Sequence, residues 1–144
     1  MTEDQFQEVL IGRYDPKAGG FSGGLLQTLG WRVQHVERVT MSGRGGRVVR
    51  KTPGTKGYPD ITAARRGQIL FLELKSETGQ VEPEQVAWLN ELCGQPDLTA
   101  DDWRSRGAEP DGSAWPSTQH GEWATLVAVV RPRHLDWLTK ALAR

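Results

Sequence analysis

The feature that most constrains this chain is the segment ILFLELK at residues 69–75, an apolar run that ends in two charged residues. Its branched and aromatic side chains over a short length predict a buried β-strand. Side chains alternate along a strand, so Glu73 and Lys75 point to one face and Leu74 to the other. A fold built on this strand must therefore place a carboxylate and an ammonium group together at the end of a sheet.

A second short strand at residues 60–64 follows the tetrapeptide GYPD and begins at Asp60. Gly67 marks a turn between the two strands, which predicts an antiparallel hairpin. Asp60 and Glu73 are equally distant in sequence from this turn, so we expect them to lie nearly opposite each other. Two carboxylates and the ammonium group of Lys75 then converge at one end of the sheet.

Two adjacent carboxylates repel each other, and burying them is costly unless a cation neutralises them. Mg²⁺ or Mn²⁺ suits Asp60 and Glu73, because hard divalent ions prefer oxygen ligands. The backbone carbonyl of Leu74 offers a further oxygen. Lys75 beside such an ion can orient or deprotonate a water and stabilise charge on phosphorus. The same residues also fit an ordinary interpretation, a surface Glu73–Lys75 salt bridge and an aspartate in a turn.

The rest of the pattern predicts a single α/β domain over residues 1–144, with helices packed on a mixed sheet. The expected elements in chain order are a helix after Thr2, a short helix at 25–29, strands at 31–39, 60–64 and 69–75, a helix at 82–92, a strand at 123–130 and a helix from 132 or 133. The segments 12–24 and 95–122 do not fit this order. We expect both to be insertions: the first a loop, the second an arm, a dimerisation element or a disordered loop.

These motifs resemble the VRR-NUC (virus-type replication-repair nuclease) branch of the PD-(D/E)XK superfamily. The matching features are G-x-P-D at 57–60, E-x-K at 73–75, a turn at Gly79, and a helix that carries Gln85 and Trp88. The core of the likeness covers residues 25–92 and 124–142. It implies a restriction-endonuclease-like core with a mixed β-sheet flanked by helices, in a stand-alone nuclease of the phage type.

The resemblance also implies two further catalytic residues. The family places a glutamate on its first helix beside the metal, and Glu3 matches that position best. Glu8, rather more than one helical turn further on, is the rival. Gln85 takes the place of the family's helix glutamine, near the attacking water or a phosphate. As an alternative, the glutamates fit solvated charges on a helix, and Gln85 fits an ordinary exposed helix residue.

The formal net charge of zero conceals a segregation of charge along the chain. Residues 32–76 carry ten Lys and Arg against three acidic residues, whereas residues 77–122 carry ten Asp and Glu against two arginines. Basic residues just before Asp60 are well placed in sequence to hold a phosphate backbone. They are Arg44, Arg47, Arg50, Lys51 and Lys56. A basic loop without a target has the same composition, but the catalytic candidates lie inside this basic stretch.

We therefore predict a Mg²⁺- or Mn²⁺-dependent DNA endonuclease that hydrolyses phosphodiester bonds. The resemblance implies action on branched DNA, such as four-way (Holliday) junctions or flaps, in replication, repair or recombination. Cutting both strands of a two-fold symmetric junction needs two sites, so we expect a homodimer. Two alternatives stay open: a restriction-type or nicking endonuclease, and a non-catalytic DNA-binding module that keeps the fold.

The remaining features bear on compartment and on other metals. Cys93 is the one cysteine, which excludes an internal disulfide, and no apolar run approaches the roughly 18 residues of a membrane span. We expect a cytoplasmic protein without a membrane partner, in a bacterial cell or a phage-infected host. The three histidines, His35, His120 and His134, lack a recognised ligand spacing and do not predict a zinc site.

Overall fold

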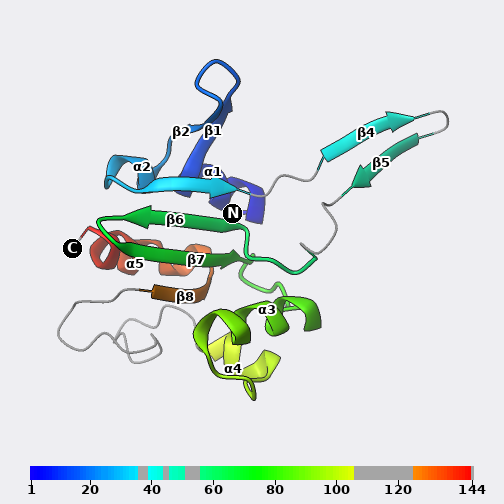
Figure 1. Ribbon diagram of the computed structural model, residues 1–144, viewed down its shortest axis with the longest axis vertical. Coiled ribbons are helices and arrows are strands. Elements are labelled where there is room, and N and C mark those ends of the chain that lie inside the picture. The colour runs from blue at the N-terminus through cyan, green and yellow to red at the C-terminus, as the bar shows by residue number, and fades with distance from the viewer. Residues whose placement is uncertain (36–38, 44–45, 51–55, 106–124, 144) are drawn as a thin grey trace.

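The computed structural model describes residues 1–35, 39–43, 46–50, 56–105 and 125–143, with the backbone alone for 39–43, 46–50 and 105. A four-stranded sheet in the order β3-β6-β7-β8 forms its centre (Figure 1). Its strands are β3 (Arg32–His35), β6 (Ile61–Arg65), β7 (Gln68–Leu74) and β8 (Thr125–Val130). The pairs β3–β6 and β6–β7 are antiparallel and β7–β8 is parallel. The expected α/β class with a mixed sheet is confirmed.

The β6–β7 hairpin has the register that the sequence predicts. Ile61 lies opposite Leu72, and the turn contains Gly67 with a φ of 82°, a left-handed conformation that glycine adopts without strain. Asp60 and Glu73 each lie one residue beyond the Ile61–Leu72 pair. Both carboxylates therefore reach the same end of the sheet, at the open end of the hairpin.

One face of the sheet is covered by α1 (Glu3–Ile11), α2 (Leu25–Thr28) and α5 (Leu135–Leu142). Its buried core contains Phe6 and Leu10 from α1, Leu26 from α2, and Leu138 and Leu142 from α5. The even-numbered positions of β7 and β8 face this layer, as the alternation of side chains requires. This is the larger of the two cores, and it sets α1 against the sheet.

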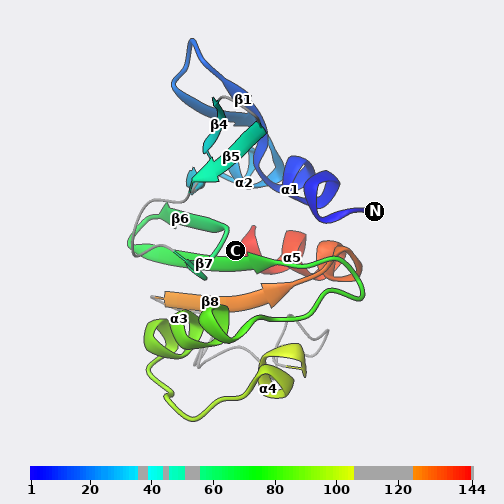
Figure 2. The ribbon, with the colours of Figure 1, turned by 90° about the vertical axis from the view of Figure 1, so that its right-hand side faces the viewer.

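The other face of the sheet packs against α3 (Pro83–Cys93) and α4 (Ala100–Ser105), which Figure 2 shows below β8, whereas α1 and α2 lie above β6. Val127 and Val129 of β8 meet Leu89 and Trp103 there. Trp103 is fully buried and donates its indole N–H to Asn90 Oδ1 at 2.7 Å. The molecule is thus a three-layer sandwich, with helices on both faces of the sheet.

The segment 12–24, expected as a loop, is instead a β-hairpin of β1 (Gly12–Asp15) and β2 (Gly20–Gly23). Gly12 ends α1 with a φ of 75°, and a Cβ atom there would lie 1.8 Å from the carbonyl oxygen of Ser22. Glycine is therefore what lets the chain pass directly from the helix into a closely paired strand. The glycines that suggested a loop instead allow two backbone segments to lie close together.

The basic segment after β3 forms a second hairpin, with β4 (Val39–Gly43) antiparallel to β5 (Gly46–Arg50). Figure 1 shows this hairpin extending away from the four-stranded sheet. The expected order of elements has no hairpin between the strands at 31–39 and 60–64, so this hairpin adds to it. β4 follows the last residue of β3, and β5 precedes β6, so the hairpin is inserted between His35 and Asp60.

The segment 95–122 was expected to be an inserted arm, dimerisation element or disordered loop, but its first part contains α4, which supplies the buried Trp103. Its remainder from residue 106 onward lies outside the described residues. After β8, a single 3-10 turn, η2 (Pro132–His134), leads into α5. Among the described residues no helix has the length and apolar character needed to cross a membrane.

Candidate metal and catalytic site

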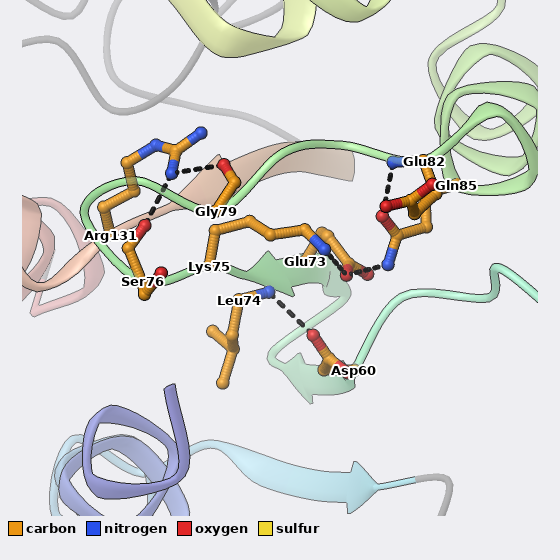
Figure 3. A network of polar contacts seen from close by, with 9 residues as sticks. All are labelled: Asp60, Glu73, Leu74, Lys75, Ser76, Gly79, Glu82, Gln85 and Arg131. Atoms are coloured by element: carbon orange, nitrogen blue, oxygen red, sulfur yellow. Dashed lines mark hydrogen bonds and ion pairs between the residues drawn. The ribbon is translucent and has the colours of Figure 1, made fainter. Parts of the chain in front are cut away.

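Asp60 and Glu73 meet at the open end of the β6–β7 hairpin (Figure 3). The backbone N–H of Leu74 donates to Asp60 Oδ2 at 2.8 Å, which fixes the aspartate against the neighbouring strand. Glu73 is only 1% exposed, and Asp60 is half-buried. The two carboxyl groups lie close enough to share a hydrogen bond when one of them is protonated. The convergence predicted from the hairpin register is therefore present.

Burial determines the protonation of this pair. It raises the pKa of Glu73 from its ordinary 4.5 to about 9, with a further contribution from the charge of Asp60, while Lys75 opposes the shift. Burial also raises the pKa of Asp60, although the Leu74 N–H favours its ionised form. In the absence of a cation the pair therefore retains a proton at neutral pH, and a cation would take the place of that proton.

Lys75 faces the same side as Glu73 and is 8% exposed. Its Nζ lies 3.6 Å from Glu73 Oε1, and its backbone N–H donates to the carbonyl of Val130 at 3.0 Å. The alternative of a surface salt bridge does not hold, because both side chains are buried. An ammonium group held inside a protein beside two carboxylates is well placed to act on an anionic substrate.

Gln85 lies in the first turn of α3 and contacts Glu73. Its Nε2 donates to Glu73 Oε1 at 2.5 Å, and its Oε1 accepts from the Glu82 N–H at 2.8 Å in a capping box at the start of the helix. Both ends of the amide are therefore fixed. Gln85 orients the buried glutamate, and the alternative of an ordinary exposed helix residue does not apply.

The glycine of G-x-P-D lets the tetrapeptide pack closely against the first turn of α3. Gly57 has a φ of 84°, and a Cβ atom there would lie 2.4 Å from the carbonyl carbon of Glu84. Trp88, one turn further along α3, donates its indole N–H to the Lys56 carbonyl at 3.1 Å and meets Tyr58 edge-on at 5.0 Å. This contact between tetrapeptide and helix holds Asp60 and Gln85 in fixed relative positions.

Glu3 reaches the site from α1, whereas Glu8 does not. The carboxylate of Glu3 accepts a hydrogen bond from the backbone N–H of Ser76 and lies within electrostatic reach of Lys75 and Asp60. Burial raises the pKa of Glu3, and Lys75 opposes that shift. Glu8 forms an ion pair with Arg13 on the surface. Of the two rivals, Glu3 is the one that the fold brings to the other carboxylates.

The five basic residues expected to hold DNA are placed less completely. Arg44 and Lys51 lie outside the described residues, and Arg47 and Arg50 occupy β5, of which only the backbone is described. The side chain of Lys56 is exposed, and its Nζ forms an ion pair with Glu84 at 3.2 Å. Of the five, the structure therefore places the backbone of Arg47 and Arg50 and the side chain of Lys56.

Two contacts at the site were not anticipated from the sequence. His35 Nδ1 lies 2.6 Å from the carbonyl oxygen of Asp60, so the last residue of β3 supports the loop that carries the aspartate. Arg131, 3% exposed, donates to the carbonyls of Ser76 and Gly79 just beyond Lys75. The position of Arg131 one residue beyond a buried strand was a usable signal, but its relevance depends on β8 lying beside β7.

The donors present fit a divalent cation. Across the described residues there is no group of three or more Asp, Glu, His or Cys side chains that could hold a metal. Mg²⁺ needs fewer, since it commonly binds one or two carboxylates and completes its shell with water and substrate phosphate. Glu73 Oε2 is buried and has no hydrogen-bond partner among the described groups. A cation held by Asp60, Glu73 and the Leu74 carbonyl would satisfy that oxygen.

Comparison with known proteins identified no relative of this chain. No family model, no curated protein and no solved structure matches this chain. The assignment of a function therefore depends on the chemistry of the site and on the motifs that the chain carries.

Proposed function

We propose that this protein is a Mg²⁺- or Mn²⁺-dependent endodeoxyribonuclease of the PD-(D/E)XK type, similar to VRR-NUC nucleases. The observation that carries the proposal is the convergence of Asp60, Glu73, Lys75 and Gln85 in one buried polar cluster at the end of a hairpin. A structural role does not account for this cluster, because burying two carboxylates together destabilises a fold that gains no ligand. The basic composition of the segment inserted between His35 and Asp60 supports a polyanionic substrate.

The residues divide the work of phosphodiester hydrolysis as follows. Asp60, Glu73 and the carbonyl of Leu74 would hold the cation, which when bound supplies positive charge for the scissile phosphate and the attacking water. Lys75 holds the water or a phosphate oxygen and stabilises the negative charge that develops as a water oxygen bonds to phosphorus. The attacking water gives up one proton as this bond forms, the P–O bond to the leaving oxygen breaks, and that oxygen takes up one proton, so that one water is added across the bond. Gln85 keeps Glu73 in position throughout.

Branched DNA is the substrate class that the resemblance favours, with four-way junctions ahead of flaps. A two-fold symmetric junction cut on both strands calls for two active sites, so a homodimer is part of the proposal. A restriction-type enzyme would instead cut linear duplexes at a preferred sequence. A binding module would retain DNA without cutting it.

The test is cleavage of a labelled four-way junction, a flap and a linear duplex of matched sequence, each with Mg²⁺, Mn²⁺ or EDTA. We expect paired symmetric cuts in the junction with either metal and none in EDTA. Glu73→Gln should lower the rate by at least about 100-fold, whereas Glu91→Gln, an exposed carboxylate on α3, should leave it unchanged. Binding without cleavage of any substrate would exclude the nuclease and favour the module.

A further inference from the structure

A second polar cleft lies next to the end of β7 and is not used by the proposed chemistry. It has a volume of about 430 Å³ and contains three arginines from separate elements of the fold. Its lining consists of Glu77, Thr78, Gly79, Gln80, Arg104, Arg131 and Arg133. We refer to these seven residues as the arginine cleft. The turn that follows Lys75 forms one wall. Arg104 comes from α4, Arg131 directly follows β8, and Arg133 lies in η2.

Arg131 is the fixed member of the arginine cleft. It is 97% buried, since only 3% of its surface is exposed, and its Nη1 donates to the Ser76 carbonyl at 2.5 Å and the Gly79 carbonyl at 2.8 Å. Figure 3 shows these two bonds on one side of the guanidinium and another nitrogen directed away from both carbonyls. Carbonyl oxygens satisfy part of the fork but do not neutralise its charge.

The balance of charge in the arginine cleft favours an anion. Glu77 is its one carboxylate, and Arg133 already engages it through Nη1 at 3.0 Å and through its backbone N–H at 2.7 Å. Arg104 is exposed, and among the described residues it has no ion pair. Three guanidinium groups thus face one carboxylate. Burial lowers the pKa of Arg131, and the charges of Arg133 and Arg104 lower it further, while the carboxylates of Glu77 and Glu3 oppose the shift.

Ser76 connects the arginine cleft to the catalytic residues. Its backbone N–H donates to Glu3, and its carbonyl accepts from Arg131, so one peptide segment contacts both sites. Ser76 also directly follows Lys75 in the chain. An anion in the cleft would therefore lie beside a phosphate held at the Asp60–Glu73 pair, as successive phosphates of one DNA strand do.

We propose that the arginine cleft binds a phosphate of the DNA strand that flanks the scissile phosphate. Guanidinium forks suit a phosphate diester, since they donate parallel hydrogen bonds to its two free oxygens. The proposal rests on the function proposed above, because it assumes that DNA occupies the neighbouring site. Its role is to position the strand, and it takes no part in the bond-breaking step.

The test compares two double variants that each remove two exposed arginines. The cleft variant, Arg104→Ala with Arg133→Ala, removes the two exposed cations of the cleft and keeps the buried Arg131. The control, Arg32→Ala with Arg66→Ala, removes the same charge from the opposite end of the sheet. Junction binding is measured in EDTA over a range of salt concentrations. We expect the cleft variant to bind about five- to tenfold more weakly, with a salt slope reduced by about one per lost phosphate contact. The control should change less than about twofold.

Two further measurements locate the contact. A neutral methylphosphonate is placed at each backbone position in turn, and one position near the cut should weaken wild-type binding but not binding of the cleft variant. Single-turnover cleavage at saturating DNA should remain within about twofold of wild type, because the cleft acts in binding. An equal loss of junction affinity in both double variants would overturn the proposal, because the loss would then reflect net charge alone.

The outcomes also separate this proposal from the nuclease function. If the cleft variant binds and cuts DNA as well as wild type does, the cleft does not bind the DNA strand, and the proposed nuclease function still stands. If wild type neither binds nor cuts DNA, the proposed nuclease function is wrong. Titration of that protein with inorganic phosphate, followed by NMR of the arginine side chains, would then reveal an anion site for a free phosphate, which also overturns the DNA-strand assignment.

Discussion

The two ends of the β6–β7 hairpin each hold a charged side chain with an unsatisfied buried atom. Among the described residues, Glu73 Oε2 at the open end and Arg65 Nε near the turn have no hydrogen-bond partner. Arg65 donates to the Leu29 carbonyl at 2.9 Å, and its guanidinium lies 4.5 Å from the centre of the Trp31 ring. Glu73, by contrast, faces a second carboxylate, Asp60.

The difference shows which end of the hairpin requires a ligand. A carbonyl dipole and an aromatic face stabilise the charge of Arg65, so the side chain at the turn end needs no ligand from outside the protein. At the open end, a carboxylate meets another carboxylate in a buried setting, which an external cation would stabilise. An unpaired buried atom alone does not call for a ligand, whereas an unpaired buried carboxylate oxygen beside a second carboxylate supports the cation site that we propose. The predictions below test this contrast.

The largest effect is expected for Lys75→Ala. Loss of the ammonium group should reduce single-turnover cleavage by about 10²- to 10⁴-fold, because in the proposed mechanism this group acts on the water or the developing phosphorane charge. Lys140→Ala, an exposed lysine on α5, is the matched control and should cleave at the wild-type rate. Circular dichroism establishes that both variants fold. Cleavage by Lys75→Ala within threefold of wild type would remove Lys75 from the mechanism.

The next effect is a dependence of stability on pH in metal-free protein. Glu73 has a pKa of about 9 in the folded state against 4.5 ordinarily, so the folded state holds a proton that the unfolded state releases between these values. Its contribution to stability is therefore greatest below pH 4.5 and is lost as pH rises toward 9. The slope is at most about 1.4 kcal/mol per pH unit. Urea unfolding in EDTA at several pH values measures it.

Two controls connect that slope to the site. Glu73→Gln cannot ionise, so its stability should vary much less with pH, and at pH 8 the metal-free variant should be more stable than wild type. Saturating Mg²⁺ or Mn²⁺ should stabilise wild type most at high pH, where the cation no longer competes with a proton. An identical slope in Glu73→Gln would assign the pH dependence to other groups.

The sequence predicted the site because its geometry depends on local rules. A turn at Gly67 and the alternation of β7 determine where Asp60, Glu73 and Lys75 lie, and these three could be placed without knowing the rest of the fold. Arg131 could not, because its position beside Ser76 depends on β8 pairing in parallel with β7. The long connection between those strands carries no local signal that specifies the pairing.

The two hairpins outside the central sheet were missed for a different reason. The segment 12–24 contains five glycines, which signal turns, so its short strands had no alternating apolar pattern by which to be recognised. Phe21 meets its cross-strand partner Tyr14 edge-on at 5.5 Å and His35 of β3 at 5.3 Å, and the second contact joins the hairpin to a distant segment. Tertiary contacts of this kind override a weak local preference.

A smaller effect is expected at the turn end. Arg65→Ala should lower the free energy of unfolding by about 1–3 kcal/mol, because the Leu29 carbonyl loses its donor and Trp31 loses the cation above it. Arg66→Ala, exposed at the tip of the same turn, should stay within about 0.5 kcal/mol of wild type. Metal stabilisation should be unaltered in both. A change in metal affinity in Arg65→Ala would show that the two ends of the hairpin are coupled.

The smallest effect separates the two glutamates of α1. Glu3→Gln should slow cleavage about tenfold, equivalent to about 1.4 kcal/mol, because its carboxylate lies near Lys75 and Asp60. Glu8→Gln should change the rate less than twofold, since Glu8 pairs with the exposed Arg13. The two substitutions remove the same charge from the same helix, so a difference in rate reports position alone. Equal rates would mean that the open end functions with residues of β6, β7 and α3 and needs nothing from α1.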